Sequence, residues 1–428
     1  MIKTVRPTNS LRGTITLPGD KSISHRSAIF NSIAKGHATI SNFSLGEDCS
    51  STIDCLKQLG VKIHREKTSS SIIEIEGSNS TFLKPTQILN AGNSGTTLRL
   101  LSGILAAQQF ETIISGDHSL NRRPMGRIIK PLNLMGANVQ SQSGNERPPI
   151  SFHSSNLKGI EYKMPIASAQ VKSCLMIASL FANKKTIITE LSPTRDHTER
   201  MMLNMGANIA IKDQTIEINP GKLTSLSMTV PGDMSAAAFW LVAATIHKDA
   251  KIIIREVGMN PSRTAIVTLL QNMGAKISIN NMREVGGEPI ADLTVESSEI
   301  KGIEIKGEMI PSLIDELPII AVAACFAKGK TIIEDAQELR AKESDRISAI
   351  VQELKRLNAK IRETPNGMVI EGNNSLAGAS CESHGDHRIA MAIAIAAINA
   401  KGVTNISDAE CVSISYPEFW ETLLTIEH

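Results

Sequence analysis

Residues 17–26, LPGDKSISHR, place an unusual number of polar groups at one expected helix start. A Pro-Gly turn precedes Lys21, Ser22 and Arg26, and the apolar run AIFNSIA that follows is typical of a helix. Capping explains Ser or Asp at a helix start, but a cation there opposes the helix dipole unless an anion offsets it. The phrase therefore predicts an anionic ligand.

Similar polar phrases precede five further apolar runs, each without a polar face, as in a helix buried on most sides. The expected helix starts are GDKSISHR (19–26), NAGNSGTTLR (90–99), ASAQVKS (167–173), PGDMSAA (231–237), PSLIDELP (311–318) and HGDHRIA (384–390). The cations of these starts and of neighbouring loops are Lys21, Arg26, Lys172, Arg388, Arg122, Arg123, Arg195, Lys342 and Arg346. Because unpaired N–H groups at helix starts bind phosphate and carboxylate, the starts together predict a cleft for small anions.

Two carboxylates are candidates for proton transfer. Asp315 lies at the start of an otherwise apolar helix, and Glu343 lies in AKESDR between Lys342 and Arg346. As a pair they could serve as base and acid, whereas a solvated ion-pair network would explain Glu343 equally well, so the pattern leaves their roles open. The turn GNSGT (92–96) matches no nucleotide-binding fingerprint and no cluster has metal-ligand spacing, so neither kind of cofactor is expected.

A repeat must position these residues. A β-rich phrase recurs as HATISNF (37–43), FETIISG (110–116), KTIITEL (185–191), AKIIIRE (250–256), KTIIEDA (330–336) and VTNISDA (403–409). After each of the first five copies, an amphipathic stretch ends at a Gly or Asn that is typical of a helix C-terminus. The sixth copy breaks off at EFWETLLTIEH, and we expect the N-terminal segment SLRGTITLPGD to complete its unit.

The repeat predicts an α/β fold of two similar domains, each of three units. Residues 1–18 with 232–428 are expected to form one domain, from units four to six, and residues 19–231 the other. The chain would then cross between the domains twice, with hinges near 17–21 and 229–233, where LPGDKS and VPGDMS supply Pro-Gly turns. Two ordinary turns are the alternative interpretation.

Composition limits the class of protein. The chain has 428 residues, more than one core usually holds, and its net charge of +2 with 3% aromatic residues disfavours nucleic-acid binding. The longest apolar run, at 389–398, is too short to span a membrane, and MIKTVRPTNS lacks the apolar core of a signal peptide. We expect a soluble, cytoplasmic protein with reduced thiols, and a monomer because a closed six-unit design needs no partner.

Seven phrases spread over the whole chain resemble, in order, the 3-phosphoshikimate 1-carboxyvinyltransferase (EPSP synthase) family: LPGDKSISHRS, NAGNSGTTLRLLSG, RPMGRIIKPL, SAQVKS, DELPIIAVAACFAKGKT, ELRAKESDR and GDHRIAMAIAIAA. The resemblance implies the enolpyruvyl transferase fold, with three βαβαββ units and buried parallel helices in each of two closing domains. It implies transfer of the enolpyruvyl group of phosphoenolpyruvate to the 5-hydroxyl of shikimate 3-phosphate by addition and elimination, in the route to chorismate and aromatic amino acids. It implies no cofactor.

The resemblance also assigns residues to the two substrates. Shikimate 3-phosphate would be bound by Ser22, Arg26, Ser168, Ala169, Gln170, Arg195, Asp315 and Lys342. Phosphoenolpyruvate would be bound by Lys21, Gly95, Arg123, Gln170, Arg346 and Arg388. Asp315 resembles the base that takes the 5-hydroxyl proton, Glu343 resembles the acid that protonates the methylene carbon, and Lys21 is the third catalytic residue.

SAQVK and SPTRDHTER resemble the class II subgroup of the family. Ala169 stands where the other branch has a second Ser, and SISYPEF lacks the Lys with which that branch binds phosphoenolpyruvate, so this contact has no assigned residue. The family is the target of glyphosate. Gly95 predicts sensitivity, because insensitive members carry Ala there, whereas the subgroup predicts the opposite.

Two other functions remain as alternatives. The sister enzyme that acts on UDP-N-acetylglucosamine typically uses a Cys in the loop corresponding to HSLNRRP, but no Cys lies between Cys55 and Cys174. A catalytically silent protein that binds anionic metabolites is the second alternative.

Overall fold

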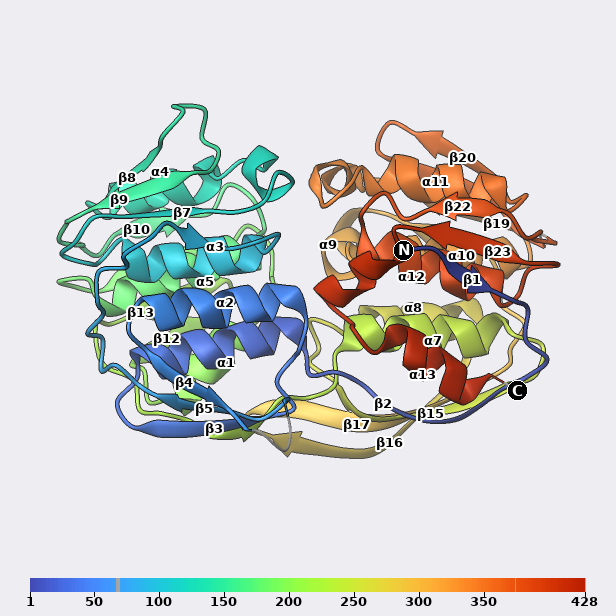
Figure 1. The fold of residues 1–428 in the computed structure, drawn as a ribbon, viewed down its shortest axis with the longest axis horizontal. Helices are drawn as coiled ribbons and strands as arrows, with labels where there is room; N and C mark the ends of the chain where they lie inside the picture. The colour runs from blue at the N-terminus through green and yellow to red at the C-terminus, as the bar shows by residue number, and fades with distance from the viewer. Residues whose placement is uncertain (67–69, 374, 428) are drawn as a thin grey trace. The chain divides into compact units, whose positions relative to one another are not determined.

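The computed structural model describes residues 1–66, 70–373 and 375–427, which form two compact units (Figure 1). The first unit comprises Met1–Pro18, Pro231–Glu284 and Pro289–His428, and the second comprises Gly19–Val230 and Val285–Glu288. The buried hydrophobic side chains form two clusters, one inside each unit. The hairpin tip Val285–Glu288 belongs to the second unit although its strands belong to the first, which the repeat pattern did not indicate.

Three mostly buried helices form the centre of each unit. They are α1 (Lys21–Ile33), α3 (Gly95–Leu105) and α5 (Ala169–Leu180) in the second unit, and α7 (Met234–Ile246), α10 (Leu317–Phe326) and α12 (His387–Ala397) in the first. In the first unit the three helices contact one another. In the second unit α3 packs against both α1 and α5, and Arg26 of α1 donates a hydrogen bond to Ser173 of α5. All six begin inside the polar phrases, which confirms the predicted helix starts.

A second set of helices is amphipathic and covers the central ones. These are α2 (Glu47–Gln58), α4 (Gly126–Leu134), α6 (His197–Asn204), α8 (Ala265–Met273), α11 (Arg346–Arg356) and α13 (Phe419–Ile426). The first five are each followed by a residue with positive φ: Gly60, Gly136, Gly206, Gly274 and Asn358. Glycine adopts this conformation without a steric cost and asparagine tolerates it, so the chain can turn there into the next strand.

Six small sheets repeat one plan within the described residues: each β-rich phrase forms a strand with a parallel neighbour on one side and an antiparallel neighbour on the other (Figure 1). The sheets of the second unit are β14 (Met228–Thr229)-β3 (His37–Ser41)-β5 (Ile73–Glu76)-β4 (Lys62–Arg65), β6 (Leu89–Asn90)-β7 (Thr112–Ser115)-β9 (Ile150–His153)-β8 (Asn138–Ser141) and β10 (Glu161–Lys163)-β11 (Thr186–Thr189)-β13 (Thr215–Ile218)-β12 (Ile209–Lys212). Those of the first unit are β2 (Leu11–Thr16)-β15 (Ala250–Gly258)-β17 (Glu288–Glu296)-β16 (Lys276–Val285), β18 (Glu304–Ile305)-β19 (Lys330–Ile333)-β21 (Gly367–Glu371)-β20 (Lys360–Thr364) and β1 (Lys3–Val5)-β23 (Thr404–Ser407)-β22 (Ser380–Glu382).

The N-terminal strands do not all complete the sixth unit as expected. Strand β1 does, because Lys3 pairs with Ile406 of β23. The SLRGTITLPGD strand, β2, instead runs parallel to β15 of the fourth unit, with Leu11 opposite Ala250. The reason is that β14, the strand leading into α7, pairs with β3 in the second unit. This leaves β15 without a preceding parallel strand, and β2 takes that place.

The glycine of LPGD is required by a close approach of the backbone. A Cβ atom on Gly19 would lie 1.7 Å from the carbonyl oxygen of Asn42, which itself has a φ of 52°. At the related VPGD turn, a Cβ on Gly232 would lie 3.1 Å from the carbonyl oxygen of Glu256. The first turn therefore excludes every side chain, whereas the second is only tight.

Membrane-spanning character was sought among the described helices. No single one of them has both the length and the apolar composition of a span, and one pair, Gly307–Leu313 with Leu317–Phe326, meets these criteria only when both are joined across a 110° bend.

Candidate active site

The second part of the 17–26 phrase, from Lys21 onward, forms the start of α1 in the second unit. The Asp20 carboxylate caps the helix by accepting a 2.9 Å hydrogen bond from the backbone N–H of Ile23. The Lys21 ammonium group pairs with the Asp48 carboxylate of α2. The sequence analysis expected an external anion to balance the charge of Lys21. In this structure the Asp48 carboxylate of the protein balances it instead.

Arg26 is buried and held by three elements. Its Nε donates to Thr198 Oγ1 at 2.7 Å, its Nη2 to Ser173 Oγ at 2.8 Å, and its Nη1 to the Ser22 carbonyl oxygen at 3.0 Å. Burial lowers the pKa of Arg26 to about 10, with Arg195 adding to this effect and nearby carboxylates opposing it. The guanidinium group stays charged at neutral pH, and two of its five N–H donors remain for other contacts.

The α3 start brings two guanidinium groups beside Gly95. Ser94 caps this helix through a 3.0 Å hydrogen bond from the backbone N–H of Thr97. A Cβ on Gly95 would lie 2.7 Å from Arg99 Nη1 and 3.5 Å from Arg123 Nη1. A helix N-terminus with two guanidinium groups suits a small anion. Arg99 was not among the predicted residues, although its position one turn after Gly95 could have indicated it.

The α5 start is joined to the α3 start by side-chain hydrogen bonds. Ser168 caps α5 by accepting from the backbone N–H of Val171 at 3.4 Å. The Gln170 side chain accepts from Arg99 Nη1 at 2.5 Å and donates to Thr96 Oγ1 at 2.9 Å. Eight predicted residues of the second unit are thus placed on or beside its three helix starts: Lys21, Ser22, Arg26, Gly95, Arg123, Ser168, Ala169 and Gln170. Arg195 lies in the loop before α6, where its charge acts on Arg26.

Lys172 differs from the other cations of the helix starts. Its side chain is only 1% exposed, and its Nζ lies 3.0 Å from a Glu190 oxygen and 2.5 Å from a Glu199 oxygen. Burial raises the pKa of Glu199, and Lys172 opposes this effect. Lys172 is therefore part of an internal ion cluster and does not present its charge to an external anion.

In the first unit, three cations meet at Asp315. This residue lies in the bend between α9 (Ile310–Leu313) and α10, not in the first turn of a helix as expected. Lys342 Nζ and Arg346 Nη1 each lie 3.5 Å from Asp315 Oδ1, and Arg388 Nη1 donates to the Asp315 carbonyl oxygen at 2.8 Å. The residues predicted for this unit, Asp315, Lys342, Glu343, Arg346 and Arg388, form one cluster.

Arg346 connects the two candidate proton-transfer groups. It is 1% exposed, and besides its contact with Asp315 it pairs with Glu343 at 2.7 Å and with Asp386 at 2.8 Å. Burial alone would lower the pKa of Arg346, but Asp386, Glu343 and Asp315 together raise it. The Glu343 side chain is 16% exposed, so the alternative of a solvated network does not describe it.

Asp386 is a buried member of this cluster that the sequence analysis did not single out. It caps α12 by accepting from the backbone N–H of Arg388 at 2.9 Å, and it accepts from Ser344 Oγ at 3.1 Å. Burial opposes ionisation, but Arg346 holds the pKa of Asp386 below its ordinary value. Its position in HGDHR before an apolar run is a capping signal that could have identified it.

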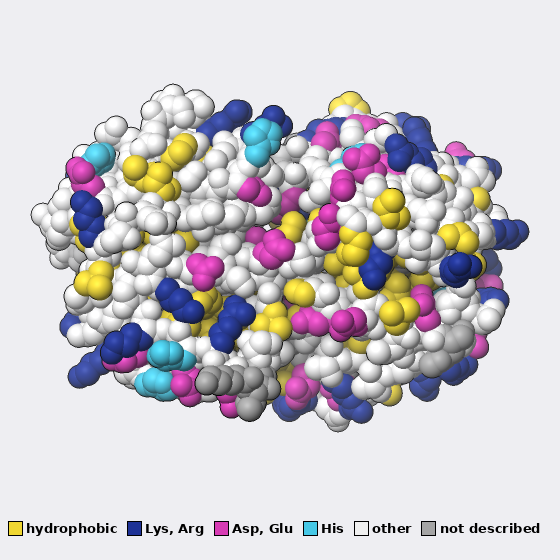
Figure 2. All heavy atoms as spheres, in the orientation of Figure 1, with side chains coloured by type: hydrophobic (Ala, Val, Ile, Leu, Met, Phe, Trp, Pro, Cys, Tyr) yellow, Lys and Arg dark blue, Asp and Glu magenta, His cyan; other side chains and the backbone are white. Residues whose placement is uncertain are grey.

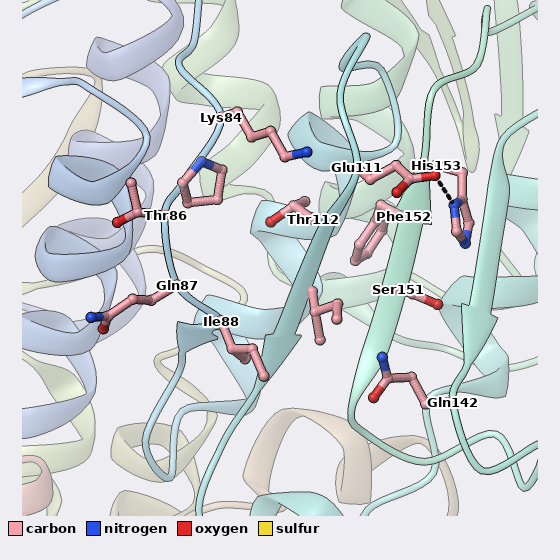
Figure 3. Close-up of a pocket in the computed structure, with 12 residues that line it drawn as sticks. Lys84, Thr86, Gln87, Ile88, Glu111, Thr112, Gln142, Ser151, Phe152 and His153 are labelled. Carbon is pink, nitrogen blue, oxygen red and sulfur yellow. Dashed lines mark hydrogen bonds and ion pairs between the residues drawn. The ribbon is translucent and has the colours of Figure 1, made fainter.

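Outside these helix starts, the described residues were searched for charged patches, cavities and metal-binding clusters. Figure 2 shows cations and carboxylates interspersed on the face in view. A cavity of about 630 Å³ in the second unit lies between residues 84–88 and strands β7 and β9, where Glu111 and His153 form a 3.0 Å contact (Figure 3). None of the predicted site residues lines it. Among residues 1–66, 70–373 and 375–427, no group of three or more His, Cys, Asp and Glu could hold a metal ion.

Comparisons with known proteins agree over the whole chain. The family model described as EPSP synthase (3-phosphoshikimate 1-carboxyvinyltransferase) matches residues 5–423. A 3-phosphoshikimate 1-carboxyvinyltransferase of Thermoanaerobacter sp. (strain X514) is 51% identical over 419 residues, covering 98% of each chain. A solved EPSP synthase structure from Acinetobacter baumannii is 40% identical, with a TM-score of 0.89 over 100% of this chain and 98% of that chain.

A more distant structure shares the fold alone. The enolpyruvyl transferase NikO from Streptomyces tendae is 15% identical, with a TM-score of 0.81 over 99% of this chain and 97% of that chain. The predicted enolpyruvyl transferase fold is thereby confirmed. Given the family match and the identity of its relatives, the chain belongs to the EPSP synthase (3-phosphoshikimate 1-carboxyvinyltransferase) family.

Proposed function

We propose that the protein transfers the enolpyruvyl group of phosphoenolpyruvate to the 5-hydroxyl of shikimate 3-phosphate. The products are 5-enolpyruvylshikimate 3-phosphate and phosphate, on the route to chorismate and aromatic amino acids. The observation that carries this proposal beyond the family relationship is that Asp315 and Glu343, a candidate base and acid, share the guanidinium group of Arg346. The alternative acceptor, UDP-N-acetylglucosamine, is not favoured by the relatives.

In the addition step, Asp315 takes the 5-hydroxyl proton while the hydroxyl oxygen attacks C2 of phosphoenolpyruvate. Glu343 gives a proton to C3, and a tetrahedral ketal phosphate forms. In the elimination step, the C2–O bond to phosphate breaks, and Glu343 takes a proton back from the new methyl group. Arg346 supports these roles because its fixed charge favours the ionised form of Asp315, which acts as base, and the carboxylate that Glu343 becomes after it gives its proton to C3.

We assign four cations the role of balancing the negative charge of phosphoenolpyruvate. Lys21, Arg123, Arg346 and Arg388 would offset the carboxylate and phosphate of phosphoenolpyruvate, and the phosphate as it departs, with the backbone at Gly95 and the Gln170 amide as neutral contacts. Lys21 would exchange Asp48 for substrate.

The remaining assigned residues hold the acceptor. We assign shikimate 3-phosphate to Ser22, Arg26, Ser168, Ala169, Gln170, Arg195, Asp315 and Lys342. Arg26 supports this assignment, because its three hydrogen bonds inside the protein orient the N–H donors that it retains. The proposal also includes a monomeric enzyme in the cytoplasm, and the mass of the purified protein in solution tests the first of these.

The reaction is tested by phosphate release from phosphoenolpyruvate with shikimate 3-phosphate in one sample and UDP-N-acetylglucosamine in another. We expect release with shikimate 3-phosphate alone, together with a product whose mass exceeds that of the acceptor by one enolpyruvyl group. Release only with the sugar nucleotide would identify the sister activity. Release with neither acceptor would favour a protein that binds anionic metabolites without catalysis.

A further inference from the structure

Glu316 is a buried carboxylate that connects several helix starts of the first unit. Its side chain is 2% exposed, and it directly follows Asp315 at the N-terminal end of α10. Its Oε1 accepts a hydrogen bond from Ser235 Oγ of α7 and lies 3.6 Å from Arg388 Nη1 of α12. One carboxylate thus contacts residues of α7 and α12, two of the helices that pack against α10.

A second cation completes the cluster. Arg263, which precedes α8 and is 5% exposed, donates to Ser235 Oγ and lies 3.7 Å from Glu316 Oε1. Glu316 therefore faces two guanidinium groups and one hydroxyl group in a site with little water. Burying an ion cluster of this kind contributes little net stability, because desolvation offsets the attraction between the charges. What such a cluster does supply is a fixed arrangement of its members.

We propose that Glu316 is a positioning residue for the proposed reaction, acting through Arg388 on phosphoenolpyruvate. Arg388 Nη1 makes two contacts: it donates to the Asp315 carbonyl oxygen at 2.8 Å and lies 3.6 Å from the Glu316 carboxylate. The two acceptors together fix the position of this nitrogen and so of this end of the guanidinium group. This role rests on the proposed function, because it assigns Arg388 to the carboxylate or phosphate of phosphoenolpyruvate.

The two possible effects of the Glu316 charge have opposite signs. Removing a negative charge beside Arg388 makes its surroundings more positive, which alone would strengthen the binding of an anion. Losing the group that orients Arg388 weakens that binding instead. The direction of the change in KM for phosphoenolpyruvate therefore distinguishes positioning from simple electrostatic attenuation.

The test is Glu316→Gln, which keeps the side-chain shape and an oxygen that can accept from Ser235. We expect KM for phosphoenolpyruvate to rise about tenfold, the loss typical of one hydrogen bond or ion pair to a charged group. We expect KM for shikimate 3-phosphate to stay within about twofold. In the first unit that substrate is assigned to Asp315 and Lys342, and Glu316 is linked to them only as the chain neighbour of Asp315. In an Arg388→Lys background, Glu316→Gln should add no further increase.

Glu353→Gln is the matched control. Glu353 is also buried in the first unit, where it pairs with His384 at 2.9 Å and accepts from the Glu382 backbone N–H at 3.0 Å. We expect it to leave both KM values unchanged. If Glu316→Gln does not fold, Ser235→Ala tests the proposal in its place, because this variant keeps every charge and removes the hydrogen bond from Ser235 to Glu316. It should raise KM for phosphoenolpyruvate about threefold.

Three results would overturn the role of Glu316. The first is an unchanged or lowered KM for phosphoenolpyruvate in Glu316→Gln, or in Ser235→Ala if only that variant folds, beside an active wild type. The second is equal losses for both substrates in Glu316→Gln and Glu353→Gln, which indicate general destabilisation. The third is a wild type with no turnover of shikimate 3-phosphate, which refutes the proposed function and this role with it.

Discussion

Replacing Lys172 by Met tests whether the cation of the α5 start belongs to the protein interior. The substitution leaves Glu190 and Glu199, 8% and 4% exposed, without the ammonium group that lies 3.0 and 2.5 Å from them. Removing one partner of a buried ion cluster costs about 3–5 kcal/mol. For a unit of this size we expect the midpoint of thermal unfolding to fall by about 10 °C.

The loss of stability in Lys172→Met should depend on pH. The pKa of Glu199 is raised in the folded protein by burial, and Lys172 opposes that rise, so the variant raises it further. A carboxyl group with a raised pKa binds more protons in the folded state than in the unfolded state, so stability falls as pH rises above the ordinary carboxyl value. The deficit relative to wild type should therefore be small near about pH 5 and large near about pH 8.

Lys185→Met is the control for this prediction. Lys185 pairs with Glu217 at 2.8 Å in the same unit, but both side chains are more than 40% exposed. An exposed pair contributes at most about 1 kcal/mol, so its unfolding midpoint should hardly move. Unfolding is followed by circular dichroism or calorimetry across the pH range. A Lys172→Met variant as stable as wild type but with a raised KM for either substrate would refute the assignment of Lys172 to the interior.

Four further substitutions test the site and the fold. Asp315→Asn and Glu343→Gln should each lower kcat at least about 100-fold while the protein stays folded, measured as phosphate release, and near-normal turnover in the double variant would contradict the mechanism. Arg26→Lys, which cannot reproduce three separate hydrogen bonds, should raise KM for shikimate 3-phosphate about tenfold or more, and an unchanged value would remove Arg26 from that site. Gly19→Ala should abolish soluble expression or lower stability by more than about 3 kcal/mol, because its Cβ would overlap the Asn42 carbonyl oxygen, and a stable variant would show that this turn can relax.

Much of the fold could be predicted because each repeat unit is a continuous stretch of sequence, and Gly or Asn residues mark where its helices end. Gly60, Gly136 and Gly206 have the positive φ that their place after an amphipathic stretch indicated, and Asn358 shows the same conformation. The exchange of strands at the crossings could not be read in this way. Strand β2 resembles the segments that close other units, but its partner is set by which sheet lacks a parallel neighbour, which is a property of the assembled unit.

The site shows the same limit. Spacing placed cations at the helix starts, and the structure puts Lys21 and Arg388 there. Arg346, which was expected in a loop, is instead the first residue of α11. Whether a cation faces a ligand or a carboxylate of the protein depends on residues distant in sequence, such as Glu190 for Lys172. Glu316 escaped notice for a related reason. Next to Asp315 in an apolar helix start it looks like a second polar residue, and only the packing of α12 and of the segment before α8 brings Arg388 and Arg263 to it.

The measurement that tests the account most directly is deuterium incorporation into the product during turnover in D₂O. If Glu343 protonates C3 of phosphoenolpyruvate and then removes a proton from the resulting methyl group, part of the product must carry deuterium in its methylene group. We predict this label in the product of the wild type and little product of any kind from Glu343→Gln. A wild-type product formed in full yield without deuterium would mean that C3 is never protonated by a group that exchanges with solvent, and would contradict addition and elimination through Glu343.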